Sequence, residues 1–340
     1  MLFIFVIVIK LECIIVFIAR LLNWICDECV PVLECEDALK FMNTSNDETT
    51  QKLRQAYCGL KDMKIMICCS DFKPQEREHP NLRLLPTFCG VSYYSRLLGG
   101  LGISLYELPW MALISLEING SLQFRCAGTV INSRYVLTAA SCVMNNEIAG
   151  VRIGEYNLEQ EYDCVGDVCE NHIQDKRVEE AIVHKDYKGP PNFEHNIALL
   201  RVQEPIDFSF KNAGPICLPW TKEQISGSIG NKLATIAGWG LFGSNEGVSI
   251  IRKAMVPVLE DCFGNVPENS TQLCTENKNN ETCVGDGGGP LMIDTTDGRI
   301  QRFVQYGILS HGPVPCGSNS PEVYTDVRKY MNWILNNIKE

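Results

Sequence analysis

The spacing of apolar positions changes three times along the chain. Residues 1–25 are almost continuously apolar, and residues 26–69 contain no helical or strand pattern long enough to bury a core. Residues 70–96 are mostly polar, with three prolines and many charges, a composition that predicts a linker. The sequence therefore predicts a leader, a small module, a linker and a larger domain over residues 97–340.

The larger domain has the pattern of a β protein. From residue 110 onward, short stretches of alternating apolar residues are separated by Gly, Pro, Asn and Asp. This spacing predicts an all-β sandwich or barrel, because successive strand side chains point to opposite faces. Only residues 327–338 follow the longer spacing of a helix.

The apolar leader favours a secretory signal over a membrane anchor. Lys10 and Glu12 interrupt the run, so no stretch is long enough to span a bilayer comfortably. Removal of the leader would also remove Cys13 and leave sixteen of the seventeen cysteines, an even number that can pair completely. We expect a secreted, extracellular protein that is not held to a membrane once the signal is removed.

Composition agrees with export and excludes one class of partner. The chain has 41 acidic and 30 basic residues and no basic run, so nucleic acid is not an expected partner. Its many cysteines predict a disulfide framework. Four glycosylation sequons fit the same compartment, with acceptors Asn43, Asn119, Asn269 and Asn280.

The cysteines of residues 26–69 form a recognisable pattern. Cys29-Val30-Pro31-Val32-Leu33-Glu34-Cys35, Cys58-Gly59 and Cys68-Cys69 resemble the clip domain that precedes arthropod serine proteases. The residues alone leave fifteen pairings open, whereas the resemblance implies Cys26–Cys68, Cys29–Cys58 and Cys35–Cys69. A redox or zinc motif at Cys26-Asp27-Glu28-Cys29 is the alternative, and the secreted context argues against it.

The larger domain resembles the chymotrypsin-like serine proteases over residues 97–340. Gly285-Asp286-Gly287-Gly288-Gly289-Pro290 matches the nucleophile loop, which reads G-D-S-G-G-P in the family, and Gly238-Trp239-Gly240 is a further family motif. The resemblance implies an all-β, chymotrypsin-like double β-barrel of two six-stranded antiparallel barrels. A C-terminal helix closes the barrels, and a small disulfide-rich clip domain precedes them.

All three positions of the catalytic triad are substituted. The family motif T-A-A-H-C carries Ser141 in place of histidine, N-D-I-A-L-L carries Asn196 in place of aspartate, and Gly287 replaces the serine. A serine is no base near neutral pH, asparagine has no charge to stabilise an imidazolium, and glycine has no nucleophilic oxygen. His195 is the only nearby substitute base, and we expect it to point away from the Asn196 side. The chain is therefore predicted to lack proteolytic activity.

The resemblance also places an oxyanion hole and a substrate pocket. The backbone N–H groups of Gly285 and Gly287 would keep the oxyanion hole. The pocket positions are Glu281, Ser310, His311, Gly312 and Glu322. Two carboxylates there predict a partly filled, acidic pocket in which one of them is protonated or salt-bridged. A metal site built from Glu281, Glu322 and His311 is the alternative.

The remaining motifs concern activation, disulfides and calcium. The segment Ser95-Arg96-Leu97-Leu98-Gly99-Gly100 resembles the activation junction. Cleavage after Arg96 would free the amine of Leu97 to pair with Asp286. The alternative is a solvated arginine in a loop.

Residues 153–163 resemble a loop that binds calcium in some relatives, where Glu155 would be a ligand or merely a solvated acid. No other cofactor is expected. The resemblance further implies the bridges Cys89–Cys217, Cys126–Cys142, Cys164–Cys169, Cys262–Cys274 and Cys283–Cys316.

Relatives without activity act as cofactors or adaptors in extracellular immune cascades. The resemblance therefore implies cascade proteases or prophenoloxidase-type zymogens as protein partners. Two other functions stay open: a decoy or inhibitor of such a cascade, and an active trypsin-like endopeptidase on grounds of fold alone. The sequence does not separate a cofactor from a decoy.

Overall fold

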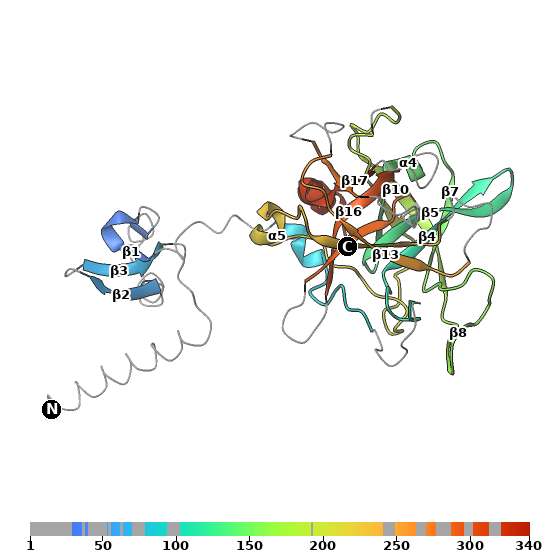
Figure 1. Cartoon of the computed structure of the whole chain (residues 1–340), viewed down its shortest axis with the longest axis horizontal. Helices are drawn as coiled ribbons and strands as arrows, with labels where there is room; N and C mark the ends of the chain where they lie inside the picture. The colour runs from blue at the N-terminus through green and yellow to red at the C-terminus, as the bar shows by residue number, and fades with distance from the viewer. Residues whose placement is uncertain are drawn as a thin grey trace. The chain divides into compact units, whose positions relative to one another are not determined.

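The chain divides into two compact units, residues 1–80 and residues 81–340 (Figure 1). Within them, the computed structural model describes residues 29–35, 38–39, 53, 56–61, 64–69, 79–93, 103–191, 193–240, 249–262, 270–276, 287–295, 302–312 and 321–340. The predicted signal, residues 1–25, lies outside these ranges. In the described part of the chain, no helix has the length and apolar character needed to cross a membrane.

The first unit is a small sheet held by disulfides. Its elements are β1 (Cys29–Pro31), η1 (Val32–Glu34), β2 (Tyr57–Lys61) and β3 (Lys64–Cys68), with strand order β1-β3-β2. Among the described residues of this unit, the buried cluster consists of Cys35, Ala38, Ala56 and Ile67. So small a core needs covalent support. Cys29–Cys58 and Cys35–Cys69 supply it, and Cys68 is also disulfide-bonded, while its expected partner Cys26 lies outside the described residues.

The second unit begins with a closed six-stranded antiparallel barrel of order β10-β11-β6-β5-β4-β7. Its strands are β4 (Met111–Ile118), β5 (Ser121–Asn132), β6 (Tyr135–Thr138), β7 (Ile148–Ile153), β10 (Gln174–Val183) and β11 (Ala198–Val202). Strand β11 is buried throughout, which fits its continuous run of apolar residues around Arg201. The short helix α4 (Ala140–Val143) follows β6, and the hairpin of β8 (Asp163–Val165) and β9 (Val168–Glu170) precedes β10.

A second six-stranded sheet has the order β13-β12-β15-β16-β17-β14. An isolated bridge between Val258 and Thr275 joins its two edges, so the sheet curls into a second barrel. Helix α5 (Lys222–Ser226), capped by Thr221, lies between the two barrels in sequence. The strands are β12 (Leu233–Gly238), β13 (Arg252–Pro257), β14 (Gln272–Thr275), β15 (Pro290–Asp294), β16 (Phe303–His311) and β17 (Glu322–Asp326).

The chain ends in the helical segment that the apolar spacing predicts. A 3-10 turn, η4 (Val327–Tyr330), leads into α6 (Met331–Asn337). The Asp326 carboxylate caps the segment by accepting from Arg328 N at 3.1 Å. Ile334, Leu335 and Ile338 are buried against the core of the first barrel. The expected all-β fold with a C-terminal helix is confirmed.

The expected linker over residues 70–96 requires a correction in its second half. Residues 81–93 belong to the second unit, and η3 (Pro80–Leu84) leads into them. Asn81 Nδ2 donates to the carbonyls of Leu335 and Ile338. Gly90 N donates to Pro215 O, and Gly90 O accepts from Phe303 N, each at 2.8 Å. Polar composition suggested a linker here because these contacts are made largely through the backbone and through three leucines spaced too irregularly to predict an element.

Four of the predicted bridges are present in the second unit. They are Cys89–Cys217, Cys126–Cys142, Cys164–Cys169 and Cys262–Cys274. Cys283 and Cys316 both lie outside the described residues, so their pairing stays a prediction. Of the sequon acceptors, Asn119 is exposed in the turn between β4 and β5, whereas Asn43, Asn269 and Asn280 fall outside the described residues.

Candidate functional site: a substituted catalytic centre

The first two triad positions are joined by hydrogen bonds. Ser141 lies in α4, directly after β6, and Asn196 directly precedes the buried segment that leads into β11. Ser141 N donates to Asn196 Oδ1 at 2.8 Å, and Asn196 Nδ2 lies 3.2 Å from Ser141 Oγ. The structure therefore brings together two positions that are far apart in sequence.

Asn196 also links this centre to the second barrel. Its side chain is fully buried, and Nδ2 donates to Ser310 Oγ at 2.8 Å on β16. Its carbonyl accepts from Thr325 Oγ1 at 2.9 Å on β17. A neutral amide can donate and accept at once, so it satisfies buried groups on both sides. Ser310 was assigned to the pocket from the sequence, and its bond to Asn196 was not foreseen.

The third triad position, Gly287, lies beside the disulfide Cys126–Cys142. A Cβ placed on Gly287 would meet Cys142 Sγ at 3.6 Å and Cys126 Sγ at 3.9 Å, which are ordinary contact distances. Gly287 O accepts from Ala127 N at 3.0 Å, which fixes the backbone against β5. Gly288 is different, since its φ is +87° and a Cβ there would lie 2.2 Å from Thr138 Oγ1. The loop thus has room for a side chain at 287 and none at 288.

Two further groups border the centre. Ser141 hydrogen-bonds to the Tyr187 side chain, and burial raises the pKa of that phenol while the Ser141 bond opposes the shift. On the other side, His311 Nδ1 lies 3.2 Å from Ser310 Oγ, and its ring stacks on Phe193 at 4.3 Å. Burial lowers the pKa of His311 and favours its neutral form. The His311 imidazole therefore contacts Ser310, the buried serine that is bonded to Asn196.

His195 faces the C-terminal helical segment. Its Nδ1 lies 2.8 Å from the Tyr330 hydroxyl, and its ring stacks on His184 at 4.8 Å. Burial raises the pKa of Tyr330 to about 12, so the phenol keeps its proton. His195 has a positive φ of 59°, so its backbone is not extended at this residue. This histidine is used in packing.

Glu322, one of the predicted pocket positions, is buried. Its side chain is buried beside Gly312, where a Cβ would lie 3.7 Å from Glu322 Cγ. Tyr324 Oη donates to Glu322 Oε2 at 2.7 Å. Burial raises the pKa of Glu322 to about 6, although the Tyr324 bond opposes the shift. Glu281, Gly285 and Asp286 lie outside the described residues, so the convergence of two carboxylates and the oxyanion hole stay predictions.

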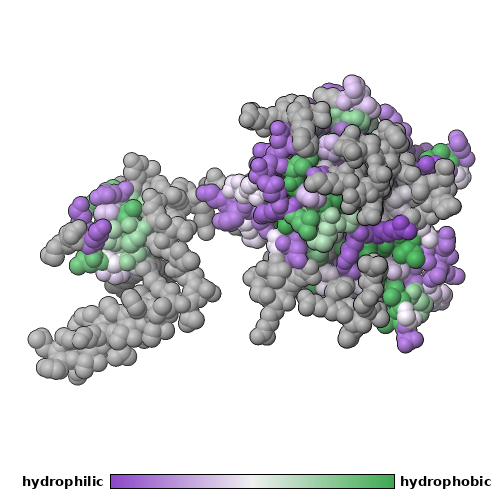
Figure 2. Space-filling view, viewed as in Figure 1, coloured by the Kyte–Doolittle hydropathy of each residue, from purple (hydrophilic) through white to green (hydrophobic). Residues whose placement is uncertain are grey.

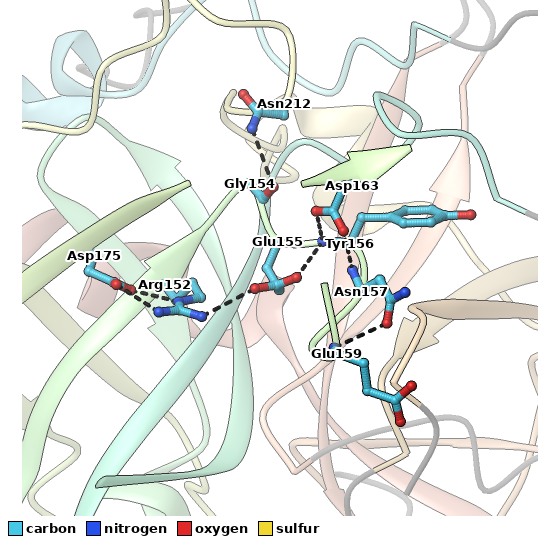
Figure 3. Close-up of polar contacts among 9 residues, drawn as sticks. All are labelled: Arg152, Gly154, Glu155, Tyr156, Asn157, Glu159, Asp163, Asp175 and Asn212. Atoms are coloured by element: carbon cyan, nitrogen blue, oxygen red, sulfur yellow. Dashed lines mark hydrogen bonds and ion pairs between the residues drawn. The ribbon is translucent and has the colours of Figure 1, made fainter. Parts of the chain in front are cut away.

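A buried charged network holds the loop after β7 (Figure 3). Glu155 Oε2 accepts from Arg152 Nη1 at 3.3 Å, and Oε1 accepts from Tyr156 N at 3.0 Å. Arg152 makes a second, two-pronged pair with Asp175 at 2.8 Å for each bond. Burial is the largest cause raising the pKa of Glu155, followed by the charge of Asp163, while Arg152 lowers it.

Asp163 completes this network from the start of β8. Its Oδ2 accepts from Tyr156 N at 3.0 Å and its Oδ1 from Asn157 N at 2.9 Å. The carboxylates of Glu155 and Asp163 are therefore both engaged with donors of the protein itself. In the described part of the chain, no group of three or more His, Cys, Asp or Glu side chains could hold a metal ion. In this arrangement Glu155 is an ion-pair partner of Arg152, and calcium binding by the loop stays a prediction.

Both parts of the chain match known families. Residues 98–334 match the family model Trypsin, and residues 28–69 match the model described as the Regulatory CLIP domain of proteinases.

Similar proteins extend over both units. The chain is 32% identical to the CLIP domain-containing serine protease HP8 of Bombyx mori, over 92% of this chain and 91% of that protein. It is 34% identical to Phenoloxidase-activating factor 1 of Holotrichia diomphalia, over 92% and 90% of the two chains. The crystal structure of the Drosophila Grass clip serine protease of the Toll pathway has a TM-score of 0.67 and 28% identity, covering 91% of this chain and 93% of that one.

Proposed function

The chain belongs to the clip-domain serine proteases, and on that premise we propose that it is a secreted, catalytically inactive member of the family. We infer that it acts as a cofactor or adaptor in an extracellular proteolytic immune cascade. Its partners would be cascade proteases or prophenoloxidase-type zymogens, bound through its surface.

The observation that carries this proposal is the composition of the catalytic centre. Ser141, Asn196 and Gly287 occupy the three triad positions, and the first two are bonded to each other. Loss of a triad costs about six orders of magnitude in turnover. The covalent frame around the centre is nevertheless kept, because Gly287 still lies against Cys126–Cys142. A retained frame without chemistry favours a role in binding.

The names of the relatives indicate which partners to test first. One is a phenoloxidase-activating factor, and another is a protease of the Toll pathway. Relatives of this kind function in protease cascades that involve phenoloxidase activation, which implies protein partners. A homolog with the same two units could compete for, or present, the same proteins.

The test combines cleavage with reconstitution. The full chain would be cut after Arg96, verified by Leu97 as the new N-terminus, and added to plasma lacking this protein while peptide hydrolysis is followed in parallel. We expect raised phenoloxidase or downstream protease activity and no hydrolysis. The uncleavable variant Arg96→Gln is the matched control and should leave the plasma unchanged.

Two results would contradict the proposal. Lowered cascade activity would identify a decoy or inhibitor. Hydrolysis of arginine peptides that is lost in the variant Asp286→Ala would identify an active endopeptidase. Such hydrolysis would also require a base and a nucleophile other than the triad positions, so His311→Ala would be the next variant to measure.

A further inference from the structure

The β8–β9 hairpin projects from the second unit as a short two-stranded ribbon (Figure 1). Cys164 and Cys169 lie directly opposite each other in its register and are disulfide-bonded. Gly166, with φ +60°, makes the turn. The ribbon therefore has a covalent cross-link close to its tip, which restricts the conformations it can adopt when unbound.

The base of the hairpin is fixed as firmly as its tip. Asp163 is buried and accepts two backbone N–H groups, as described above. Asn212 Nδ2 bonds the carbonyls of Gly154 and His172 at 3.2 and 3.1 Å, which ties both ends of the loop to one buried side chain. A surface that is ordered before binding loses less conformational entropy when a partner docks.

This ordered ribbon exposes apolar side chains. Val168 is 51% exposed and lies directly opposite Val165 in the register, so these two side chains share one face of the ribbon, whereas Tyr162, 58% exposed, lies on the other face. In Figure 2, which has the same view as Figure 1, hydrophobic and hydrophilic surface lie side by side at this projection. Apolar groups next to uncompensated charge are typical of docking surfaces rather than of simple solvated loops.

The charge around these apolar groups has one sign. Residues 153–175 include seven acidic residues and no lysine or arginine. Those at the base have partners, since Glu155 and Asp175 pair with Arg152, and Glu170 pairs with His172. By contrast, three exposed acids make no ion pair with any residue that the structure describes: Glu159, Glu161 and Asp167.

We propose that the β8–β9 hairpin is a docking surface for a protein segment that carries lysine or arginine beside an aliphatic or aromatic residue. Val165 and Val168, on one face of the ribbon, supply the apolar contact, and Glu159, Glu161 and Asp167 supply complementary charge. The inference rests on the proposed function, because it names the chemistry of a partner that such an adaptor would bind. It concerns a surface remote in sequence from the substituted centre, so it can be tested by itself.

The test measures binding of a defined probe to the full secreted chain. The probe is a fluorescent peptide of alternating lysine and leucine, and its counterpart has glutamate in place of lysine. The hairpin variant is Glu159→Gln, Glu161→Gln, Asp167→Asn and Val168→Ser. Its exposed positions should leave the thermal midpoint unchanged, and we expect its affinity for the lysine peptide to fall about tenfold. Binding should weaken with added salt.

A matched variant controls for net charge and apolar surface. Glu117→Gln, Glu147→Gln, Glu204→Gln and Leu122→Ser remove the same number of charges and one exposed apolar side chain elsewhere on the first barrel. This variant should bind the lysine peptide as the unchanged protein does. Equal loss in both variants, or no loss in the hairpin variant, would overturn the docking surface.

Reconstitution of plasma separates this inference from the proposed function. If the unchanged protein fails to raise cascade activity while the peptide still requires the hairpin, the adaptor function falls and the docking surface stands. If cascade activity rises and the hairpin variant behaves like the unchanged protein in both assays, the docking surface falls and the adaptor function stands.

Discussion

Two buried polar clusters of the second unit solve the same physical problem in different ways. Around Asn196, the cluster is neutral: one amide bonds Ser141 in the first barrel and Ser310 in the second. Around Asp163 and Glu155, the cluster is charged, with one guanidinium and several backbone N–H groups as donors. Both clusters satisfy buried oxygens that would otherwise be costly.

The difference concerns what each cluster can do. A neutral cluster has a small desolvation penalty, and it stabilises a fixed packing of the two barrels without supplying a base. A charged cluster has a larger penalty and depends on every partner, but it orders a loop that has little apolar core of its own. The cluster at the predicted triad positions is thus neutral, whereas the buried charge lies at the base of the β8–β9 hairpin.

The largest effect is expected for Asp163→Ala. The substitution removes two charge-assisted hydrogen bonds and leaves Asn157 N without an acceptor, whereas Tyr156 N keeps Glu155 Oε1, so it should lower the free energy of unfolding by about 3 to 4 kcal/mol. Denaturant titration measures this loss. Asp167→Ala, at the exposed tip of the same hairpin, is the control and should change stability by less than about 0.5 kcal/mol. A loss below about 1 kcal/mol for Asp163→Ala would show that the charged cluster is not a support of the fold.

A smaller loss is expected for Asn196→Ala. It removes the acceptor for Ser141 N and the donor to Ser310 Oγ, so unfolding should become easier by about 2 to 3 kcal/mol. Thermal or chemical unfolding checks the value, with the exposed Asn171→Ala as control. If Asn196→Ala proved more damaging than Asp163→Ala, the contrast between a neutral and a charged cluster would be reversed.

A gain is expected for Glu322→Gln. Because burial raises the folded-state pKa of Glu322 to about 6 from an ordinary 4.5, the folded protein holds this proton more tightly than the unfolded chain. Its ionisation therefore lowers stability as pH rises from 4.5 to about 6, by up to about 2 kcal/mol. Glutamine should remove that loss near neutral pH and give no gain below pH 4.5. Unfolding curves across this range that stay parallel for the two proteins would contradict the shift.

The smallest change is expected for Gly287→Ser. The new side chain would contact Cys142 and Cys126 at ordinary distances, so stability should stay within about 0.5 kcal/mol. Peptide hydrolysis should remain at background, because Ser141 supplies no base for the new hydroxyl. A fluorogenic arginine peptide measures turnover, and Gly288→Ala, where a Cβ would collide with Thr138 Oγ1, provides the steric contrast. Measurable turnover would mean that another group serves as the base.

The sequence predicted much of the fold because strand spacing and cysteine patterns are local signals. It places the three predicted triad positions by the same kind of signal, a short motif around Ser141, Asn196 or Gly287, and their assignment stays a prediction. It could not identify Ser310 as the partner of Asn196, because that contact depends on how two barrels meet. The sequence also did not predict the ion pair between Arg152 and Glu155, because the pattern of an acidic loop is the same whether its carboxylates are solvated, bound to metal or ion-paired.

The docking of residues 81–93 on the second unit has a consequence for what a partner would encounter after activation. A cut after Arg96 would leave the clip unit attached both by Cys89–Cys217 and by the backbone pairing of Gly90 with Phe303. A protein that binds one unit would then meet the other at a local concentration fixed by the tether, not by the dilution of the surrounding fluid. Two weak contacts can add up to a durable complex under that condition, and neither needs to be strong alone.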